Sequence, residues 1–102
     1  MPESTAESGK IAFNGRITIE NSGEMRTALR DALLQKPAGL PVDLSGVSYI
    51  DTSGVATLVE ATRIARKQGS RLILEGLHDQ PQDLLGIGHL DRLFDVAAQD
   101  GK

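Results

Sequence analysis

A carboxylate and two hydroxyls stand together in the segment IDTSG, residues 50–54. Asp51 follows a short apolar stretch, and Thr52, Ser53 and Gly54 lead into a helical pattern of apolar residues. Such groups can act as a nucleophile, a phosphate cradle, a helix cap or a site of modification. Each chemistry needs different neighbours, so the rest of the chain helps to separate them.

Nucleophilic catalysis is disfavoured by what surrounds the two hydroxyls. The segment lacks the glycine that stands two residues before the serine in a G-x-S-x-G elbow. The only histidines, His78 and His89, lie in loop-like segments far along the chain. Because a nucleophile needs a base and an orienting group within reach, we predict no enzyme and assign no catalytic residue.

Phosphate and metal sites also lack their usual patterns. The chain contains neither G-x-x-x-x-G-K-[ST] nor G-x-G-x-x-G, and Asp51 would repel a phosphate bound at this helix start. His78, Asp79 and His89 match no standard ligand spacing, so they are interpreted as solvated loop residues. We therefore predict no cofactor and no metal.

Helix capping is a sufficient explanation for one of the polar groups. Asp, Thr and Ser are all good N-cap residues, and any of them can accept a hydrogen bond from a free backbone N–H. Capping does not explain why several small polar groups cluster at one helix start. A modification or docking role therefore stays open beside it.

The helix after the turn carries two distinct arcs at about 100° per residue. The apolar arc, expected to face the core, contains Val55, Leu58, Val59, Ala61, Thr62 and Ala65. The opposite arc contains Ala56, Thr57, Glu60, Arg63, Ile64 and Lys67. An isoleucine among small and charged residues, next to the polar turn, indicates a contact surface that runs from the turn along the helix.

Composition limits the classes of partner. The chain has 102 residues, with 39% hydrophobic and 25% charged, as expected for one globular domain. A net charge of -3 and 3% aromatic residues argue against nucleic-acid binding. Cysteine is absent, and neither a membrane-spanning apolar run nor a secretory signal is present, so we expect a cytoplasmic protein without direct membrane insertion.

Strand and helix patterns alternate along the chain. The first half contains a strand in KIAFNGRI ending near Gly15, a helix over 21–36, and a short strand over 40–47. Asn21 and Glu24 fit a capping box at the start of the first helix, with Ser22 as a competing cap.

The second half continues the alternation. A helix runs from about Gly54 to Gln68 and is closed by Gly69, and a strand follows over 71–77. A short helix is expected over 81–88, and residues 89–96 form either a further helical turn or a final strand. The alternation predicts an α/β domain with parallel crossovers over residues 10–97, flanked by a disordered tail over 1–9 and a frayed tail over 98–102.

Several of these motifs together resemble the STAS family, the sulfate transporter and anti-sigma factor antagonist domain. The segment VDLSGVSYIDTSGVATLVEATRIARKQGSRLILEGL carries the family's DLS strand, its D-[ST]-x-G helix start, and a glycine followed by an LxLxG-like strand. HLDRLFDV resembles the closing segment of the antagonists, so the resemblance covers about residues 10–97.

The resemblance implies a small mixed β-sheet with helices packed on it, and a protein-binding domain without enzyme activity. In the antagonists, the hydroxyl residue after the Asp is phosphorylated by a serine-protein kinase that is also an anti-sigma factor. That residue is Thr52 here, with Ser53 as second choice, while Asp51 and Gly54 shape the turn. Similar single domains are subunits of lipid-transport ABC systems and dock on the ATPase subunit, which is the alternative function.

The resemblance and the helical arcs together define a predicted docking surface. Its members are Asp51, Thr52, Ser53, Gly54, Val55, Ala56, Thr57, Glu60, Ile64 and Lys67. Two departures from the family affect the neighbouring edge. Residues 1–9 show no pattern for the usual N-terminal strand, and the acidic residue that often follows Gly15 closely arrives only at Glu20.

Overall fold

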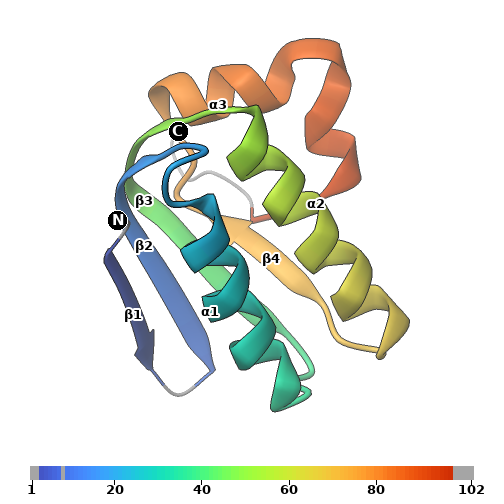
Figure 1. Cartoon of the computed structure of the whole chain (residues 1–102). Coiled ribbons are helices and arrows are strands. Elements are labelled where there is room, and N and C mark those ends of the chain that lie inside the picture. Colours follow the sequence, from blue (N-terminus) through green and yellow to red (C-terminus); the bar gives the residue numbers. More distant parts are fainter. Residues whose placement is uncertain (1–2, 8, 98–102) are drawn as a thin grey trace.

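A computed structural model describes residues 3–7 and 9–97 of the chain. Its elements are β1 Glu3–Glu7, β2 Lys10–Ile17, α1 Ser22–Leu34, β3 Leu40–Ile50, α2 Thr52–Lys67, β4 Leu72–Glu75, α3 Asp79–Gly86, the 3₁₀ helix η1 Ile87–Leu93 and β5 Asp95–Val96. The strands form one five-stranded sheet, and α1 and α2 lie side by side over it (Figure 1).

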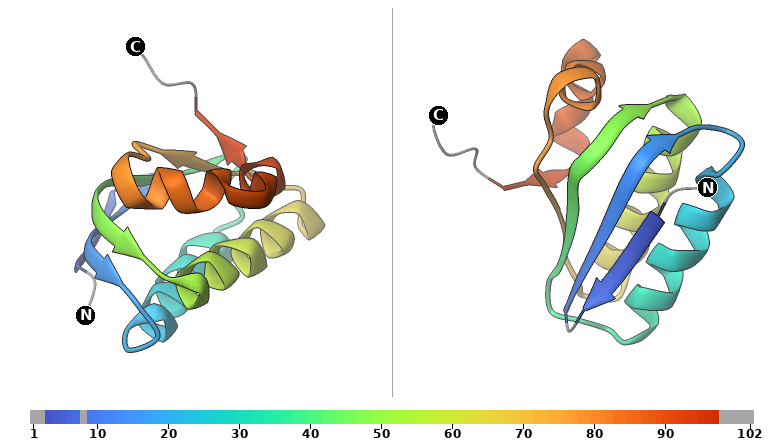
Figure 2. Two further views of the ribbon diagram at one scale, coloured as in Figure 1. Left: turned by 90° about the horizontal axis from the view of Figure 1, so that it is seen from above. Right: turned by 90° about the vertical axis from the view of Figure 1, so that its left-hand side faces the viewer.

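The sheet has the order β1-β2-β3-β4-β5. β1 is antiparallel to β2, whereas the remaining neighbours are parallel. α3 and η1 lie on the side of the sheet away from α1 and α2 (Figure 2). The predicted α/β domain with a small mixed sheet is therefore confirmed.

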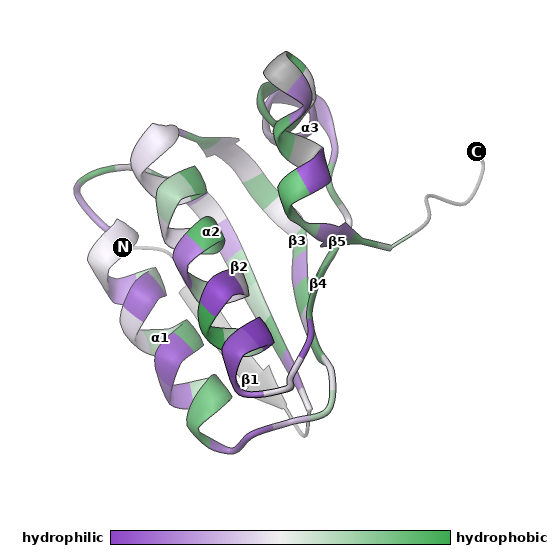
Figure 3. Cartoon of the chain, turned by 90° about the vertical axis from the view of Figure 1, so that its right-hand side faces the viewer, coloured by the Kyte–Doolittle hydropathy of each residue, from purple (hydrophilic) through white to green (hydrophobic). Residues whose placement is uncertain are grey.

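The apolar periodicities correspond to the buried core. Ile11 and Phe13 alternate inward from β2, and the predicted stripe of α1 buries Met25, Leu29 and Leu33. The inward side chains of β3, β4 and α2 complete this core: Val42, Leu44, Val47, Ile50, Leu72, Leu74, Val55, Leu58, Ala61 and Ala65. Polar residues colour the outer side of α2 most strongly toward its C-terminal end (Figure 3). Among the described residues, no helix combines the length and apolar character needed to cross a bilayer.

The expectation of a disordered tail over 1–9 is wrong for residues 3–7. β1 pairs antiparallel with β2, from Glu3 opposite Asn14 to Glu7 opposite Lys10. Gly9 has a φ of +78°, which suits the tight connection between the two strands. An edge strand is stabilised by backbone pairing on one side, so a polar segment without an apolar pattern can form it.

The predicted capping box at α1 is wrong as well, although Asn21 is the N-cap residue. Its side chain makes no hydrogen bond to the helix and turns back to the preceding loop. Asn21 Oδ1 accepts from Thr18 N at 2.9 Å, and Asn21 Nδ2 donates to the Arg16 carbonyl at 2.8 Å. The amide thus stabilises the loop between β2 and α1, which leaves Glu24 without its capping role.

The remaining boundaries differ mainly in length. β3 continues three residues past its predicted end and reaches Ile50, directly before the polar turn. Gly69 follows α2 with a φ of +82°, as expected for a glycine that closes a helix. Residues 89–96 contain both a helical turn and a final strand, since η1 ends at Leu93 and β5 follows at Asp95–Val96. The predicted frayed tail over 98–102 lies outside the described residues.

Candidate functional site

The turn Asp51–Gly54 lies where β3 ends and α2 begins. Ile17, the last residue of β2, pairs with Ile50, and Asp51 N donates to the Ile17 carbonyl at 3.0 Å. The loop that follows β2 therefore lies beside the turn. Two segments about 30 residues apart in the sequence form one surface at this end of the sheet.

Asp51 joins these two segments through its carboxylate. Oδ1 accepts from Gly54 N at 3.1 Å and from the Ser53 hydroxyl at 2.5 Å, while Oδ2 accepts from Ile19 N at 3.0 Å. The backbone of Asp51 is extended, with φ −101° and ψ −177°, as is typical of an N-cap residue. One side chain thus caps α2 and holds the neighbouring loop in place.

The same hydrogen bonds determine the protonation of Asp51. The Ser53 hydroxyl, followed by the N–H groups of Gly54 and Ile19, lowers the pKa of Asp51 because all three donate to its charged form. A carboxylate with a lowered pKa is a weaker base. Asp51 is therefore suited to hold the turn and poorly suited to remove a proton from a hydroxyl.

The two hydroxyls of the turn differ in availability. The Ser53 hydroxyl is committed to Asp51, and its side chain is half-buried. Thr52 is exposed, and its hydroxyl has no hydrogen-bond partner among the residues that the structure describes. As the first residue of α2, Thr52 also lies beside the free N–H groups of the helix start. Its oxygen is the one that an incoming molecule can reach.

Gly54 is required by close packing. A Cβ atom at this position would lie 2.5 Å from Ile50 Cγ1 and 2.9 Å from Ile17 Cγ2. Both isoleucines are core residues at the ends of their strands. The absence of a side chain at Gly54 lets the first turn of α2 rest directly on the sheet.

The structure brings only part of the predicted docking surface into contact with solvent. Thr52, Ala56 and Lys67 are exposed, Asp51, Ser53, Glu60 and Ile64 are half-buried, and Gly54, Val55 and Thr57 are buried. The buried members contribute little accessible surface and mainly support the exposed ones.

Thr57 is the clearest correction. Its side chain is 1% exposed, and its hydroxyl donates to the Ser53 carbonyl at 2.9 Å within α2. The assignment of Thr57 to the solvent-facing arc is therefore wrong.

The physical reason is that α1 packs against one flank of α2. Arg26 Nε donates to Glu60 Oε1 at 2.8 Å, and Gln68 Nε2 donates to the Leu33 carbonyl at 2.8 Å. Ile64 lies on the same flank and packs against the core. The surface free for a partner is therefore narrower than the helical arc alone predicted.

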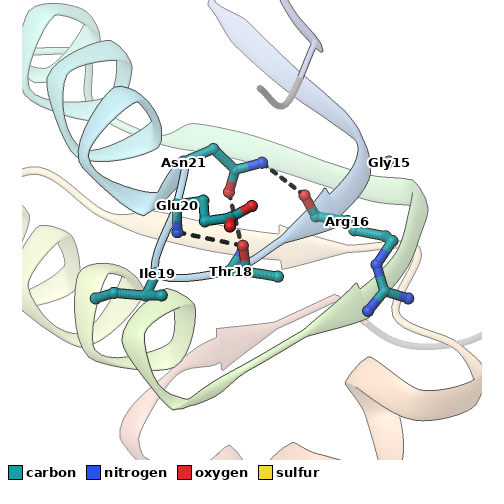
Figure 4. A pocket seen from close by; sticks show the side chains of 6 residues that line it. All are labelled: Gly15, Arg16, Thr18, Ile19, Glu20 and Asn21. Carbon is teal, nitrogen blue, oxygen red and sulfur yellow. Dashed lines mark hydrogen bonds between the residues drawn. The ribbon is translucent and has the colours of Figure 1, made fainter.

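The loop between β2 and α1 adds a feature that the sequence interpretation missed. Gly15, Arg16, Thr18, Ile19, Glu20 and Asn21 line an open hollow of about 690 Å³ (Figure 4). Ile19 is 74% exposed although Asp51 holds its backbone N–H. The sequence did contain a signal for this feature: Ile19 lies just beyond the end of a strand, in a loop that would usually be polar.

His78, Asp79 and His89 were interpreted as solvated loop residues, and among the described residues no group of three or more possible ligand side chains comes together. His78 Nδ1 lies 2.8 Å from Asp79 Oδ2, and His78 Nε2 lies 2.8 Å from the Ser45 carbonyl. Asp79 and then the Ser45 carbonyl raise the pKa of His78 because both stabilise its charged form.

Comparison with known proteins identifies the family. The sequence profile described as "Mlab, STAS domain" matches residues 1–95. The chain belongs to the STAS family. It is 31% identical over 90 residues to the anti-sigma-B factor antagonist of Bacillus subtilis strain 168, covering 88% of this chain and 82% of that one.

A second relative is named for phospholipid transport. The chain is 39% identical over 49 residues to the intermembrane phospholipid transport system binding protein MlaB of Escherichia coli K12, covering 48% of this chain and 50% of that one.

Solved structures share the STAS fold. An anti-sigma factor antagonist from Mycobacterium paratuberculosis superposes with a TM-score of 0.81 at 16% identity, covering 98% of this chain and 86% of that one. The Bacillus cell fate determinant SpoIIAA in its phosphorylated form gives a TM-score of 0.68 at 14% identity, covering 98% and 94%.

Proposed function

We propose that this STAS domain is a non-enzymatic, cytoplasmic regulator of the anti-sigma factor antagonist type. It binds a protein partner through the turn Asp51–Gly54 and the exposed part of α2, and phosphorylation of Thr52 releases that partner. The partner is a serine-protein kinase that also acts as an anti-sigma factor. The observation that carries the proposal is the exposed hydroxyl of Thr52, which has no hydrogen-bond partner among the described residues, whereas the neighbouring Ser53 hydroxyl donates to Asp51.

A phosphate on Thr52 leaves the domain folded because local terms oppose one another. It adds about -1.5 to -2 charges at neutral pH. The start of α2 favours an anion by roughly 0.3–1 kcal/mol, whereas the nearby Asp51 carboxylate repels it. Thr52 is exposed, so its phosphate needs no space inside the core.

The partner interface responds differently to the same phosphate. Docking on the turn would remove water from the phosphate, and burying a charge without a partner group costs several kcal/mol. A loss of about 2.7 kcal/mol already weakens binding about a hundredfold. Phosphorylation therefore separates the complex while the domain keeps its structure.

The exposed residues around the turn combine small, apolar and charged side chains. Thr52 and Ala56 leave room for close approach along α2, and the exposed side chain of Ile19 supplies an apolar contact beside them. Lys67 lies at the far end of the same helix. We propose to add Ile19 to the docking surface and to remove the buried Thr57 from it.

A second candidate function is an accessory subunit of a lipid-transport ABC system. The match to the "Mlab, STAS domain" profile and the likeness to MlaB favour it. In that role the turn docks on the ATPase subunit, and the Thr52 hydroxyl is a permanent interface contact. Docking then needs no kinase, and Thr52→Ala alone impairs it.

Co-purification followed by phosphorylation separates the two candidates. The affinity-tagged chain is purified from its native host, and the bound proteins are identified by mass spectrometry. We expect a kinase-like ATPase domain, which with ATP modifies Thr52 in the wild type and in Ser53→Ala but leaves Thr52→Ala unmodified. Recovery of an ABC ATPase with its permease would instead support the transport role. Phosphate on Ser53 would reject Thr52 as the regulated residue.

A further inference from the structure

Where β3 approaches the turn, its edge on the β4 side has no strand partner among the described residues. β3 pairs with β4 only from Leu40 opposite Leu72 to Asp43 opposite Glu75, yet β3 continues to Ile50. On the other edge, β2 accompanies β3 to its end. The last part of β3 is therefore a strand edge that something other than β4 must cover.

The backbone of Ile50 points toward this uncovered edge. In a parallel pair, the N–H and C=O groups of one residue face the same side, and the adjacent residues face the other side. Asp51 N donates to the Ile17 carbonyl on the β2 side, so both polar groups of Ile50 face away from β2. Left unpaired in this partly buried place, they would cost free energy.

The Gln80 side chain satisfies both groups. Its Oε1 accepts from Ile50 N at 2.9 Å, and its Nε2 donates to the Ile50 carbonyl at 2.9 Å, both in a partly buried setting. An amide side chain presents the same donor and acceptor as a strand residue, so Gln80 acts in place of the missing strand. It lies in the first turn of α3, next to the buried Pro81.

Neighbouring contacts hold α3 in this position. His78, the N-cap residue of α3, reaches the Ser45 carbonyl of β3 with its Nε2 atom. Figure 3 shows α3 beside the sheet, on the side opposite α2. Two side chains of the same short segment thus contact the β3 edge, and only Gln80 does so at the residue that precedes Asp51.

We propose that Gln80 is a positioning residue for the docking turn, connecting α3 to Asp51–Gly54 through the backbone of Ile50. Ile50 is the residue on which Gly54 rests, so a displacement of Ile50 moves the start of α2 as well as Asp51. Gln80 makes this contribution without belonging to the docking surface. That the turn binds a partner rests on the proposed function, whereas the contact from Gln80 through Ile50 to the turn exists in the free chain.

The test compares Gln80→Ala and Gln80→Glu with the control Gln82→Ala, an exposed position two residues later on the same helix. Amide hydrogen exchange of Ile50 reports its hydrogen bond to Gln80, measured relative to the amide of Leu29 in α1. Carboxyl NMR titration of Asp51 reports the geometry of the turn. A general loss of stability would not change the pKa of Asp51 within the folded state.

We expect Gln80→Ala to speed the relative exchange of Ile50 about tenfold, as for the loss of one buried hydrogen bond. The pKa of Asp51 should rise toward its ordinary value as its hydrogen bonds to the turn loosen. In Gln80→Glu a carboxylate oxygen can still accept from Ile50 N, but the donor to the Ile50 carbonyl is lost. The exchange of the Ile50 amide should therefore increase less than in Gln80→Ala. Gln82→Ala should match the wild type in both measurements.

Two results would overturn the proposal. One is relative exchange of Ile50 in Gln80→Ala that is no faster than in Gln82→Ala. The other is faster exchange with an unchanged pKa of Asp51, which would make Gln80 a local support of the strand only. Because both measurements use the free chain, a failure of Thr52→Glu to affect partner binding would reject the proposed function and leave the role of Gln80 standing.

Discussion

Removing the carboxylate of Asp51 tests whether one side chain holds the turn together. In Asp51→Ala, α2 loses its N-cap and the loop after β2 loses its bond through Ile19 N. Loss of an N-cap costs about 1 kcal/mol, and loss of a further hydrogen bond to a charged group in this half-exposed setting costs about 1 kcal/mol more. We therefore expect a total loss of about 2 kcal/mol, or roughly 10 °C in the unfolding midpoint.

Asp51→Asn separates the two functions of the carboxylate. Oδ1 serves Gly54 N and the Ser53 hydroxyl, while Oδ2 serves Ile19 N. An asparagine has one carbonyl oxygen, so it can replace only one of these two sides. Asp51→Asn should therefore lose about 1 kcal/mol, half the effect of Asp51→Ala.

The dependence on pH gives an independent check with a defined sign. Because hydrogen bonds lower the pKa of Asp51 in the folded state, the unfolded chain binds the proton first as the pH falls. The stabilisation by the carboxylate is present above its unfolded pKa of about 3.9 and disappears as the pH falls through the lower folded value. The difference between wild type and Asp51→Asn should thus shrink from pH 7 to pH 3.

Urea unfolding monitored by circular dichroism, repeated across this pH range, measures both effects. An Asp51→Ala protein within about 0.5 kcal/mol of the wild type at pH 7 would refute the reasoning, because surface substitutions away from special contacts show changes of that size. A wild-type advantage over Asp51→Asn that grows at low pH would contradict the sign of the pKa shift.

Two further substitutions test the packing of α2. Gly54→Ala should cost about 1–3 kcal/mol because its Cβ would collide with Ile50 and Ile17, whereas the control Gly23→Ala in α1 meets open space and should be neutral or stabilising. Equal urea midpoints for the two variants would contradict close packing at Gly54. Thr57→Val should lose about 1 kcal/mol, since it removes a buried hydrogen bond, and should leave partner affinity unchanged. A titration showing weaker binding at unaltered stability would return Thr57 to the docking surface.

Patterns that report burial directly were predictable from the sequence. The stripe of Met25, Leu29 and Leu33 identified α1 and its inner face, and Gly69 marked the end of α2. Asp51 was one of three candidate caps and was expected to shape the turn, and its oxygen does accept from Gly54 N. Such features depend on residues close together in the chain, so local spacing is enough to find them.

Features that depend on contacts distant in sequence were not predictable. Thr57 is buried because α1 lies against α2. A helical projection of α2 alone cannot show which of its flanks another helix covers. β1 is stabilised by backbone pairing with β2, which leaves no apolar pattern to recognise. The bond between Gln80 and Ile50 spans 30 residues and becomes visible only when α3 is placed on the β3 edge.

The affinity of the co-purified partner for unmodified and Thr52-phosphorylated chain is the most direct test of the central claim. Isothermal titration, with circular dichroism of both forms as the control for folding, gives the two dissociation constants. We expect at least about a hundredfold weaker binding after phosphorylation, with an unchanged spectrum, and the same pattern for Thr52→Glu. Equal affinities for the two folded forms would contradict the proposal that Thr52 regulates docking.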